Sequence, residues 1–282
     1  MRDLLSEGFY RLFRNKAFWC VLAFEAAYKT YSLLHNWCNV QRLRSNGTNA
    51  GIPFDELLYE YAGIALLTSC ILIPLLIGGD YADGTLRHRL IKGYRRTSVY
   101  LANWLVSTGG MLLCVAADWM VSFTLGMVLQ EEPISSPAHI LLMLTIGVGT
   151  VTACCSVNAF VVMLIPHKTV AGAVCFCLLA LTVLVGMRIY DALSLPEYWY
   201  DYVVSTSDGF RQYDMYPNPH YVSGSRRQVC LFVYDFLPFT QSFELAANSL
   251  YGNPVRMLLC SLGITAASTV GGMAAFVRKD IR

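Results

Sequence analysis

The sequence has 282 residues, of which 55% are hydrophobic and only 14% are charged. Typical soluble domains have roughly 25% charged residues, so this composition is that of a membrane protein rather than of a soluble domain. The formal net charge of +2 is small, and the positions of the basic residues along the chain are more informative than their sum.

Residues 1–16 are predicted to form an amphipathic helix that lies in the membrane interface. Apolar residues recur at helical spacing on one face, and charged residues are expected to turn away from it. The apolar set is Leu5, Phe9, Leu12 and Phe13, and the charged set is Asp3, Glu7, Arg11 and Arg14. No signal-peptide cleavage site follows, so we expect the next apolar run to stay as a membrane anchor.

Six apolar stretches are long enough to cross a membrane, since a bilayer core of about 30 Å requires about 20 helical residues. They are residues 17–34, 61–79, 100–130, 140–165, 170–189 and 255–276. The third stretch is long and contains Gly109 and Gly110, so a tilt or a local bend is expected there. We therefore predict an all-α membrane protein, with residues 1–282 forming a single transmembrane domain of six helices.

The first stretch contains two charged residues, Glu25 and Lys29, at the spacing of one helical turn. One interpretation is a mutually neutralised structural pair on one helix face. The other is that this face lines an aqueous or substrate cavity, because charges inside the membrane are costly unless they are paired or reach water. Asp118, in the third stretch, receives no role.

Alternate connections carry most of the lysines and arginines. They are the amino-terminal residues, the segment 80–99, the turn at Lys168 and the carboxyl-terminal residues. The positive-inside rule therefore places both termini in the cytoplasm, as expected for a multi-pass protein of a bacterial cytoplasmic membrane. The opposite side would hold residues 190–254, where a tyrosine-rich part either lies at the headgroup level or packs as a small cap. An apolar part broken by Pro238 and Gly252 predicts a re-entrant helical hairpin before the last span.

Ten cysteines are present, and eight of them lie in apolar runs, where free cysteine behaves as a small hydrophobic residue. Cys38 and Cys230 lie in polar connections, and the sequence leaves open whether they pair. The vicinal and C-x-C cysteines in the apolar runs point to different faces of a helix, so no metal site is expected. The sequence also lacks a phosphate-binding G-x-x-x-x-G-K-[ST] loop, an H-E-x-x-H motif and a G-x-S-x-G motif. By itself the chain is therefore not expected to be an enzyme.

The segment between the second and third stretches combines five cations with glycines and an apolar strip. Asp83 is expected to cap a two-turn helix over residues 85–92, and Gly93 is expected to end it. Leu86, Leu90 and Ile91 would form apolar knobs on this helix. A helix this short requires the membrane surface or the groove of a partner to be stable. The simpler interpretation, that the cations only set the topology and bind anionic lipid, explains the charge but not the knobs.

This segment, DGTLRHRLIKGYRRTSVYLAN, resembles the signature of ABC-2-type permeases, the membrane subunits of ATP-driven exporters such as those for antimicrobial peptides and lantibiotics. The matching positions are Asp80, Gly84, Thr85, Leu86, Leu90, Gly93, Arg96, Tyr100 and Leu101. The resemblance implies that the segment is a coupling helix that docks on a separate ATPase subunit, which binds ATP and Mg. The residues so implied are Asp83, Gly84, Thr85, Leu86, Arg87, Leu90, Ile91, Gly93 and Arg96.

The resemblance also implies a second permease, identical or a sister chain, and a hydrophobic or amphipathic substrate such as a peptide, a lantibiotic or a drug. The expected partners are thus the ATPase, the second permease and the lipid membrane, with no nucleic acid. One alternative is a non-transporting sensor or scaffold that binds a ligand at its outer segment and recruits a cytoplasmic partner. A secondary transporter is less favoured, because no internal repeat and few intramembrane carboxylates are present.

Overall fold

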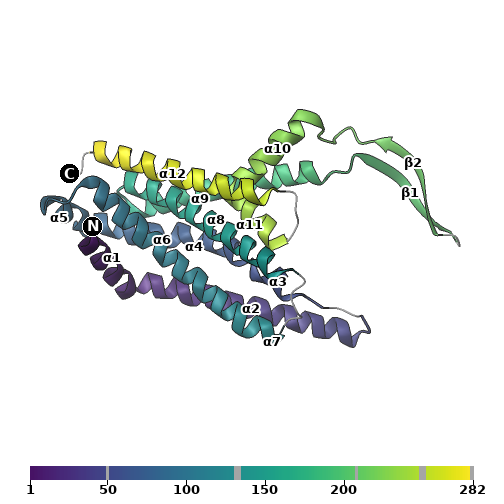
Figure 1. The fold of residues 1–282 in the computed structure, drawn as a ribbon, viewed down its shortest axis with the longest axis horizontal. Helices are drawn as coiled ribbons and strands as arrows, with labels where there is room; N and C mark the ends of the chain where they lie inside the picture. Colours follow the sequence, from purple (N-terminus) through teal and green to yellow (C-terminus); the bar gives the residue numbers. More distant parts are fainter. Residues whose placement is uncertain (49–50, 130–134, 207–208, 248–251, 280–282) are drawn as a thin grey trace.

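The computed structural model describes residues 1–48, 51–129, 135–206, 209–247 and 252–279, which are almost entirely helical (Figure 1). The helices are α1 (Arg2–Arg14), α2 (Lys16–Ser45), α3 (Phe54–Leu58), α4 (Tyr61–Ala82), α5 (Thr85–Ile91), α6 (Arg96–Val121), the π-helix η1 (Ser122–Gly126), α7 (Met127–Leu129), α8 (Pro137–Leu164), α9 (Lys168–Ser194), α10 (Gly224–Phe236), α11 (Pro238–Ala247) and α12 (Pro254–Arg278). Strands β1 (Tyr198–Thr206) and β2 (Gly209–Pro217) form an antiparallel hairpin.

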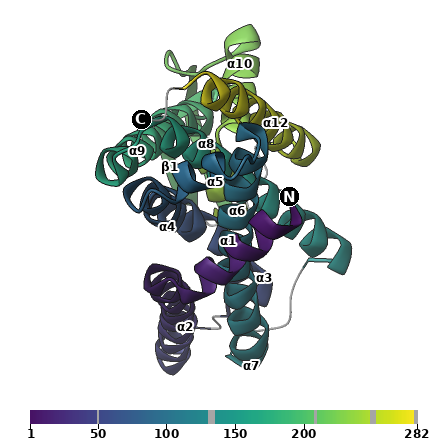
Figure 2. The same ribbon diagram turned by 90° about the vertical axis from the view of Figure 1, so that its left-hand side faces the viewer.

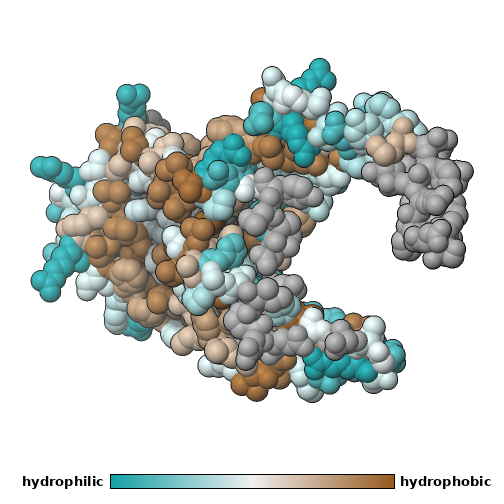
Figure 3. Space-filling view, turned by 45° about the vertical axis from the view of Figure 1, so that its right-hand side comes forward, coloured by the Kyte–Doolittle hydropathy of each residue, from teal (hydrophilic) through white to brown (hydrophobic). Residues whose placement is uncertain are grey.

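In the described part of the chain, five helices are long and apolar enough to cross a membrane, and they confirm five of the six predicted stretches. They are α4, α8, α9, α12 and the continuous helix Arg96–Leu129. The chain is thus a multi-pass membrane protein, and Figure 3 shows apolar side chains over the body of the bundle. The remaining stretch lies in α2, which has 30 residues but is less apolar because it contains charged residues such as Glu25 and Lys29. That α2 crosses the membrane stays a prediction.

Helix α8 lies at the centre of the bundle, where it packs against α4, α6, α9 and α12 (Figure 2). Small residues on α8 allow this close packing. A Cβ atom added to Gly147 would lie 2.1 Å from the hydroxyl oxygen of Tyr61, which donates a hydrogen bond of 3.1 Å to the Leu144 carbonyl. The core is therefore built around α8.

Helix α1 crosses α6 near the end of the bundle that carries the start of α1, α5 and the end of α12 (Figure 1). We call this end the terminal end. Glycines set the contact between α1 and α6: a Cβ atom on Gly8 would lie 2.6 Å from Val106 Cγ2, and one on Gly110 would lie 3.1 Å from Leu12. The predicted helix is confirmed, but its buried face is Leu4, Gly8 and Leu12, and Phe13 is exposed. Glu7 and Arg11 were expected to turn away and instead bond to residues of α5 and α4. That α1 lies in the membrane interface stays a prediction.

The long third stretch does not break at its two glycines. Helix α6 runs through Gly109 and Gly110, which instead make room for Phe9 and Leu12 of α1. The irregular geometry comes later, in the π-helix η1, where a Cβ atom on Gly126 would lie 2.9 Å from the Phe54 ring. The close approach of α1 accounts for the double glycine, and the expected tilt or bend of this stretch stays a prediction.

The segment before the last span contains two helices, α10 and α11, with Pro238 as the first residue of α11. That this helical hairpin re-enters the membrane stays a prediction. Gln241 of α11 accepts hydrogen bonds of 2.6 Å from both Thr150 of α8 and Ser261 of α12, which fixes the hairpin to the bundle. The tyrosine-rich part was not expected to form strands. The β1–β2 hairpin projects away from the bundle and does not pack on it as a cap (Figure 1). Cys38 and Cys230 are free thiols.

Candidate functional site

Helix α5 begins and ends at two glycines in the left-handed conformation. Gly84 has a φ of +66° and Gly93 a φ of +89°, values that side-chain-bearing residues rarely adopt. The predicted helix and its end at Gly93 are confirmed. The predicted cap is wrong, because no side chain caps α5, and Asp83 instead ends α4, with its backbone N–H bonded to the Gly79 carbonyl at 2.9 Å. The turn at Gly84 starts α5 directly after α4, so the Asp83 side chain stays exposed.

The apolar residues of α5 do not form the predicted set of knobs for a partner. Leu86 is only 1% exposed and belongs to the core of this chain, and Leu90 packs against the same core. Only Ile91 is free, with 73% of its surface exposed. Residues 86, 89 and 90 share the inward face because they are spaced by three or four residues, whereas Arg87, His88, Ile91 and Lys92 form the exposed face.

Arg89, the third residue of the inward face, is the centre of a buried group of charges. Its Nη1 donates to Asp80 Oδ2 at 3.2 Å and to Asn103 Oδ1 at 3.0 Å, and its Nη2 donates to Glu7 Oε1 at 3.1 Å. Arg11 donates to the other carboxylate oxygen of Asp80. We call these five residues the arginine cluster. It connects α1, α4, α5 and α6 at the terminal end.

The arginine cluster balances two guanidinium groups against two carboxylates. Asp80 is 4% exposed and Arg89 is 3% exposed. Charges buried to this extent are tolerated only when they are paired and hydrogen-bonded, and removing one partner leaves the other uncompensated. Because the planar guanidinium of Arg89 holds several acceptors at once, a displacement of α5 has to move α1, α4 and α6 or break this cluster.

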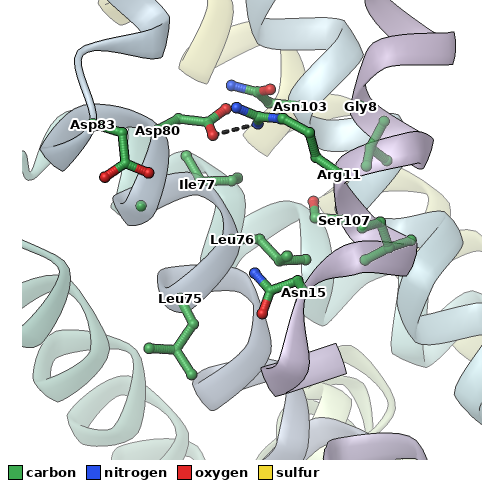
Figure 4. A pocket seen from close by; sticks show the side chains of 13 residues that line it. Gly8, Arg11, Asn15, Leu75, Leu76, Ile77, Asp80, Asp83, Asn103 and Ser107 are labelled. Carbon is green, nitrogen blue, oxygen red and sulfur yellow. Dashed lines mark hydrogen bonds and ion pairs between the residues drawn. The ribbon is translucent and has the colours of Figure 1, made fainter. Parts of the chain in front are cut away.

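A cavity of about 140 Å³ lies next to the arginine cluster, between α1, α4 and α6. Figure 4 shows Arg11 reaching across it to Asp80, with Asn15, Asn103 and Ser107 among the polar residues of its wall and Leu75, Leu76 and Ile77 on the α4 side. A cavity of this size with several polar partners can hold ordered water. The cluster therefore borders a space that can hold water.

Arg96, the last residue of the predicted coupling set, links two helices at the terminal end. Arg96 donates hydrogen bonds to the carbonyl oxygens of Val277, at 3.0 Å, and of Lys279, which ties the start of α6 to the end of α12. Lys279 donates in turn to the Tyr81 hydroxyl at 2.9 Å and to the Met163 carbonyl at 3.0 Å. Burial lowers the pKa of the Lys279 ammonium. Arg96 is thus a link within the chain and not part of the exposed face of α5.

Glu25 and Lys29 do not form the predicted mutual pair. Lys29 is fully buried and donates to the Leu57 carbonyl, and its Nζ lies 3.7 Å from Glu60 and 4.0 Å from Asp118. Glu25, 2% exposed, instead accepts a hydrogen bond from Thr68. The reason is that α4, α6 and the residues before α4 bring better-placed partners than the next turn of α2. We call Lys29, Glu60, Asp118, Glu25 and Thr68 the lysine cluster.

The lysine cluster places two carboxyl groups, those of Glu60 and Asp118, beside one ammonium group, and Glu25 with its donor Thr68 adjoins Asp118. Asp118, to which the sequence assigned no role, is thus a partner of Lys29. Both Glu25 and Lys29 are enclosed by this chain, and a role for them in lining a cavity stays a prediction.

Sequence reasoning missed the arginine cluster because it treated Arg89 as one of five topology-setting cations. A signal was present. Arg89 lies three residues after Leu86 and next to Leu90, so it shares their helix face, and Asp80 ends an apolar run where a lone carboxylate requires a partner. The contribution of Glu7 and Arg11 had no such signal, because it depends on where α1 crosses the bundle.

No protein-family model and no curated protein sequence matches this chain.

Proposed function

We propose that this chain is the membrane-spanning permease subunit of an ATP-driven ABC exporter, with α5 as the helix that docks on a separate ATPase subunit. The observation that carries the proposal is that α5 combines one exposed face with one fixed face. Ile91 lies exposed among Arg87, His88 and Lys92, while Arg89 on the other face is bonded to three other helices. A short helix of this kind suits recognition in a partner's groove.

The partner surface that fits the exposed face has a small apolar pocket for Ile91 and carboxylates around it. Arg87 and Lys92 would meet those carboxylates, and complementary charge of this kind favours correct orientation and fast association. ATP and Mg would be bound by the ATPase, and this chain would supply only the docking helix. Both termini and α5 would then lie in the cytoplasm of a bacterial cell.

The arginine cluster provides the path by which movement of the ATPase would reach the spans. When α5 shifts, the bonds from Arg89 to Asp80, Asn103 and Glu7 would carry the shift to α4, α6 and α1. A second permease, identical or a sister chain, would complete the transport path, and α2 would be the sixth span. The substrate class, a hydrophobic or amphipathic peptide, lantibiotic or drug, comes from the resemblance of the segment 80–101 to ABC-2-type permeases.

The test is to purify the chain in a mild detergent with an ABC ATPase encoded beside it, and to compare Ile91→Asp with Val229→Asp. Val229 is 61% exposed on α10, at the opposite end of the bundle, and is the matched control. We expect Ile91→Asp to abolish co-purification and substrate-stimulated ATP hydrolysis while the chain keeps its melting temperature. Equal ATPase binding by Ile91→Asp and by the unmodified chain would contradict the proposal.

The second candidate function is a non-transporting sensor or scaffold. The observation in its favour is the β1–β2 hairpin, which projects from the bundle in the manner of a ligand-binding arm (Figure 1). The two candidates differ in one measurement. An exporter in vesicles with its ATPase moves its substrate only when ATP is supplied, whereas a sensor binds its ligand and its cytoplasmic partner without moving anything.

A further inference from the structure

A second cavity, of about 260 Å³, lies between the last turns of α9 and the helices α10 and α11, away from the terminal end. Its wall is aromatic. The rings of Tyr190 and Phe243 meet edge to face with their centroids 5.2 Å apart, and Phe239 stacks on Phe243 at 6.4 Å. Tyr234 completes the aromatic wall. Four aromatic side chains from three helices thus surround one space, which we call the aromatic cavity.

The wall of the aromatic cavity is held in place by close packing and hydrogen bonds. Gly186 allows α11 to approach α9, because a Cβ atom there would lie 2.5 Å from Thr240 Cγ2. Thr240 donates to the carbonyls of Tyr234 and Leu237, the latter at 2.8 Å. Tyr234 is only 1% exposed, and its hydroxyl donates to Glu244 at 3.1 Å. The cavity is therefore formed before any ligand arrives, which lowers the cost of binding.

The charges around the aromatic cavity favour a cation. Asp191 lines it, one helical turn after Met187, and lies within salt-bridge distance of no basic side chain in the described part of the chain. No lysine or arginine is among the lining residues. The cavity also lies at the carboxyl end of α9, which ends at Ser194, and helix carboxyl ends carry partial negative charge.

We propose that the aromatic cavity is a binding site for an organic cation with an apolar body, such as a quaternary ammonium compound. Aromatic faces attract quaternary ammonium groups, whose charge is spread over methyl or methylene groups and requires no hydrogen-bond acceptor. Asp191 supplies the counter-charge, while Met187 and the aromatic rings contact the apolar body. This property goes beyond export, because it belongs to the chain alone and requires neither the ATPase nor the second permease.

Benzyltrimethylammonium is titrated into the purified full-length chain in a neutral maltoside detergent, and its Kd is measured by titration calorimetry. Its neutral isostere neopentylbenzene, in which carbon replaces the nitrogen, is titrated in parallel. Asp191→Asn and Phe243→Leu are compared with matched controls outside the cavity, Glu197→Gln and Phe232→Leu, which are an exposed acid and an exposed ring. We expect each cavity variant to raise the Kd for benzyltrimethylammonium roughly five- to tenfold, and each control to leave it unchanged.

Competition identifies the source of the cation. If short-chain phosphatidylcholine displaces the probe and phosphatidylglycerol does not, the natural ligand is a lipid headgroup. If neither lipid displaces the probe, the ligand is a free organic cation. The proposal is overturned if neopentylbenzene binds as tightly as the cation, or if the cavity variants bind the cation as the controls do. Because Phe243→Leu and Asp191→Asn act on different features of the site, a folding defect in one leaves the other informative.

Discussion

Replacing Arg89 by methionine removes the centre of the arginine cluster while it keeps a side chain of similar length. Asp80 then loses one of its two guanidinium partners, and Asn103 loses its donor inside the protein. Glu7 is half-exposed and returns to solvent, so its bond contributes little. We expect Arg89→Met to lower the stability of the chain.

The size of this loss of stability follows from the partners that Arg89 leaves behind. Breaking a buried ion pair costs about 3–5 kcal/mol, and the lower end applies here because Arg11 still compensates Asp80. In a chain of this size a loss of about 3 kcal/mol corresponds to a decrease in melting temperature of roughly 6–12 °C. Arg89→Lys keeps the charge but not the planar fork that reaches several acceptors at once, so its effect should be intermediate.

The assay is thermal unfolding of the purified chain in detergent. After heating to each temperature, the fraction of protein that remains folded is measured by size-exclusion chromatography. Arg87→Met is the matched control, because Arg87 is an exposed arginine two residues earlier on the same helix. The double variant Asp80→Asn with Arg89→Met should lose less than the sum of the single losses, since the two residues are in contact. Two results would refute a stabilising role of the arginine cluster. One is that Arg89→Met lowers the melting temperature no more than Arg87→Met does. The other is that the double variant loses the full sum of the two single losses of stability.

Two further predictions use the same assay. Gly8→Ala should destabilise the chain by about 1–3 kcal/mol, because its Cβ atom would lie 2.6 Å from Val106 Cγ2. Gly63→Ala, on α4 with no atom nearby, should be neutral or stabilising by up to about 1 kcal/mol, and equal effects at the two glycines would count against the α1–α6 contact. Lys29→Met should destabilise by about 3–5 kcal/mol, because two carboxylates lose their ammonium partner. Lys16→Met, at an exposed lysine of the same helix, should have little effect on stability. Equal losses of stability in the two variants would contradict the role given to Lys29.

The spans and the short helix of the segment 80–99 could be predicted because they depend on local patterns. Long apolar runs require helices in a membrane, and Gly93 ends α5 because a left-handed residue cannot continue a helix. The β1–β2 hairpin was missed although the sequence has a hairpin turn signal, Asp208-Gly209, between two runs rich in aromatic and β-branched residues. Those aromatic residues also suit a membrane interface or a cap, and the segment was assigned to one of these instead. The sixth span stays a prediction, since the charges of α2 weaken its apolar character.

The site was predicted only in part, and the errors have one origin. A short helix has two faces, and the sequence does not say which one the bundle covers. Leu86 was expected to meet a partner and is instead buried in this chain, while Ile91 alone remains exposed. Glu25 and Lys29 have the spacing of a helical pair, yet each finds a partner on another helix.

The sequence by itself determined that this is a multi-pass helical membrane protein with a short basic helix bounded by glycines. Those properties follow from hydropathy, helix periodicity and backbone conformation, which act over a few residues. Only the tertiary structure decided which charges are paired. Arg89 meets Asp80, Asn103 and Glu7 because the crossing of α1 over α6 brings three other helices to one point. Contacts between distant segments depend on packing geometry, and no local pattern records it.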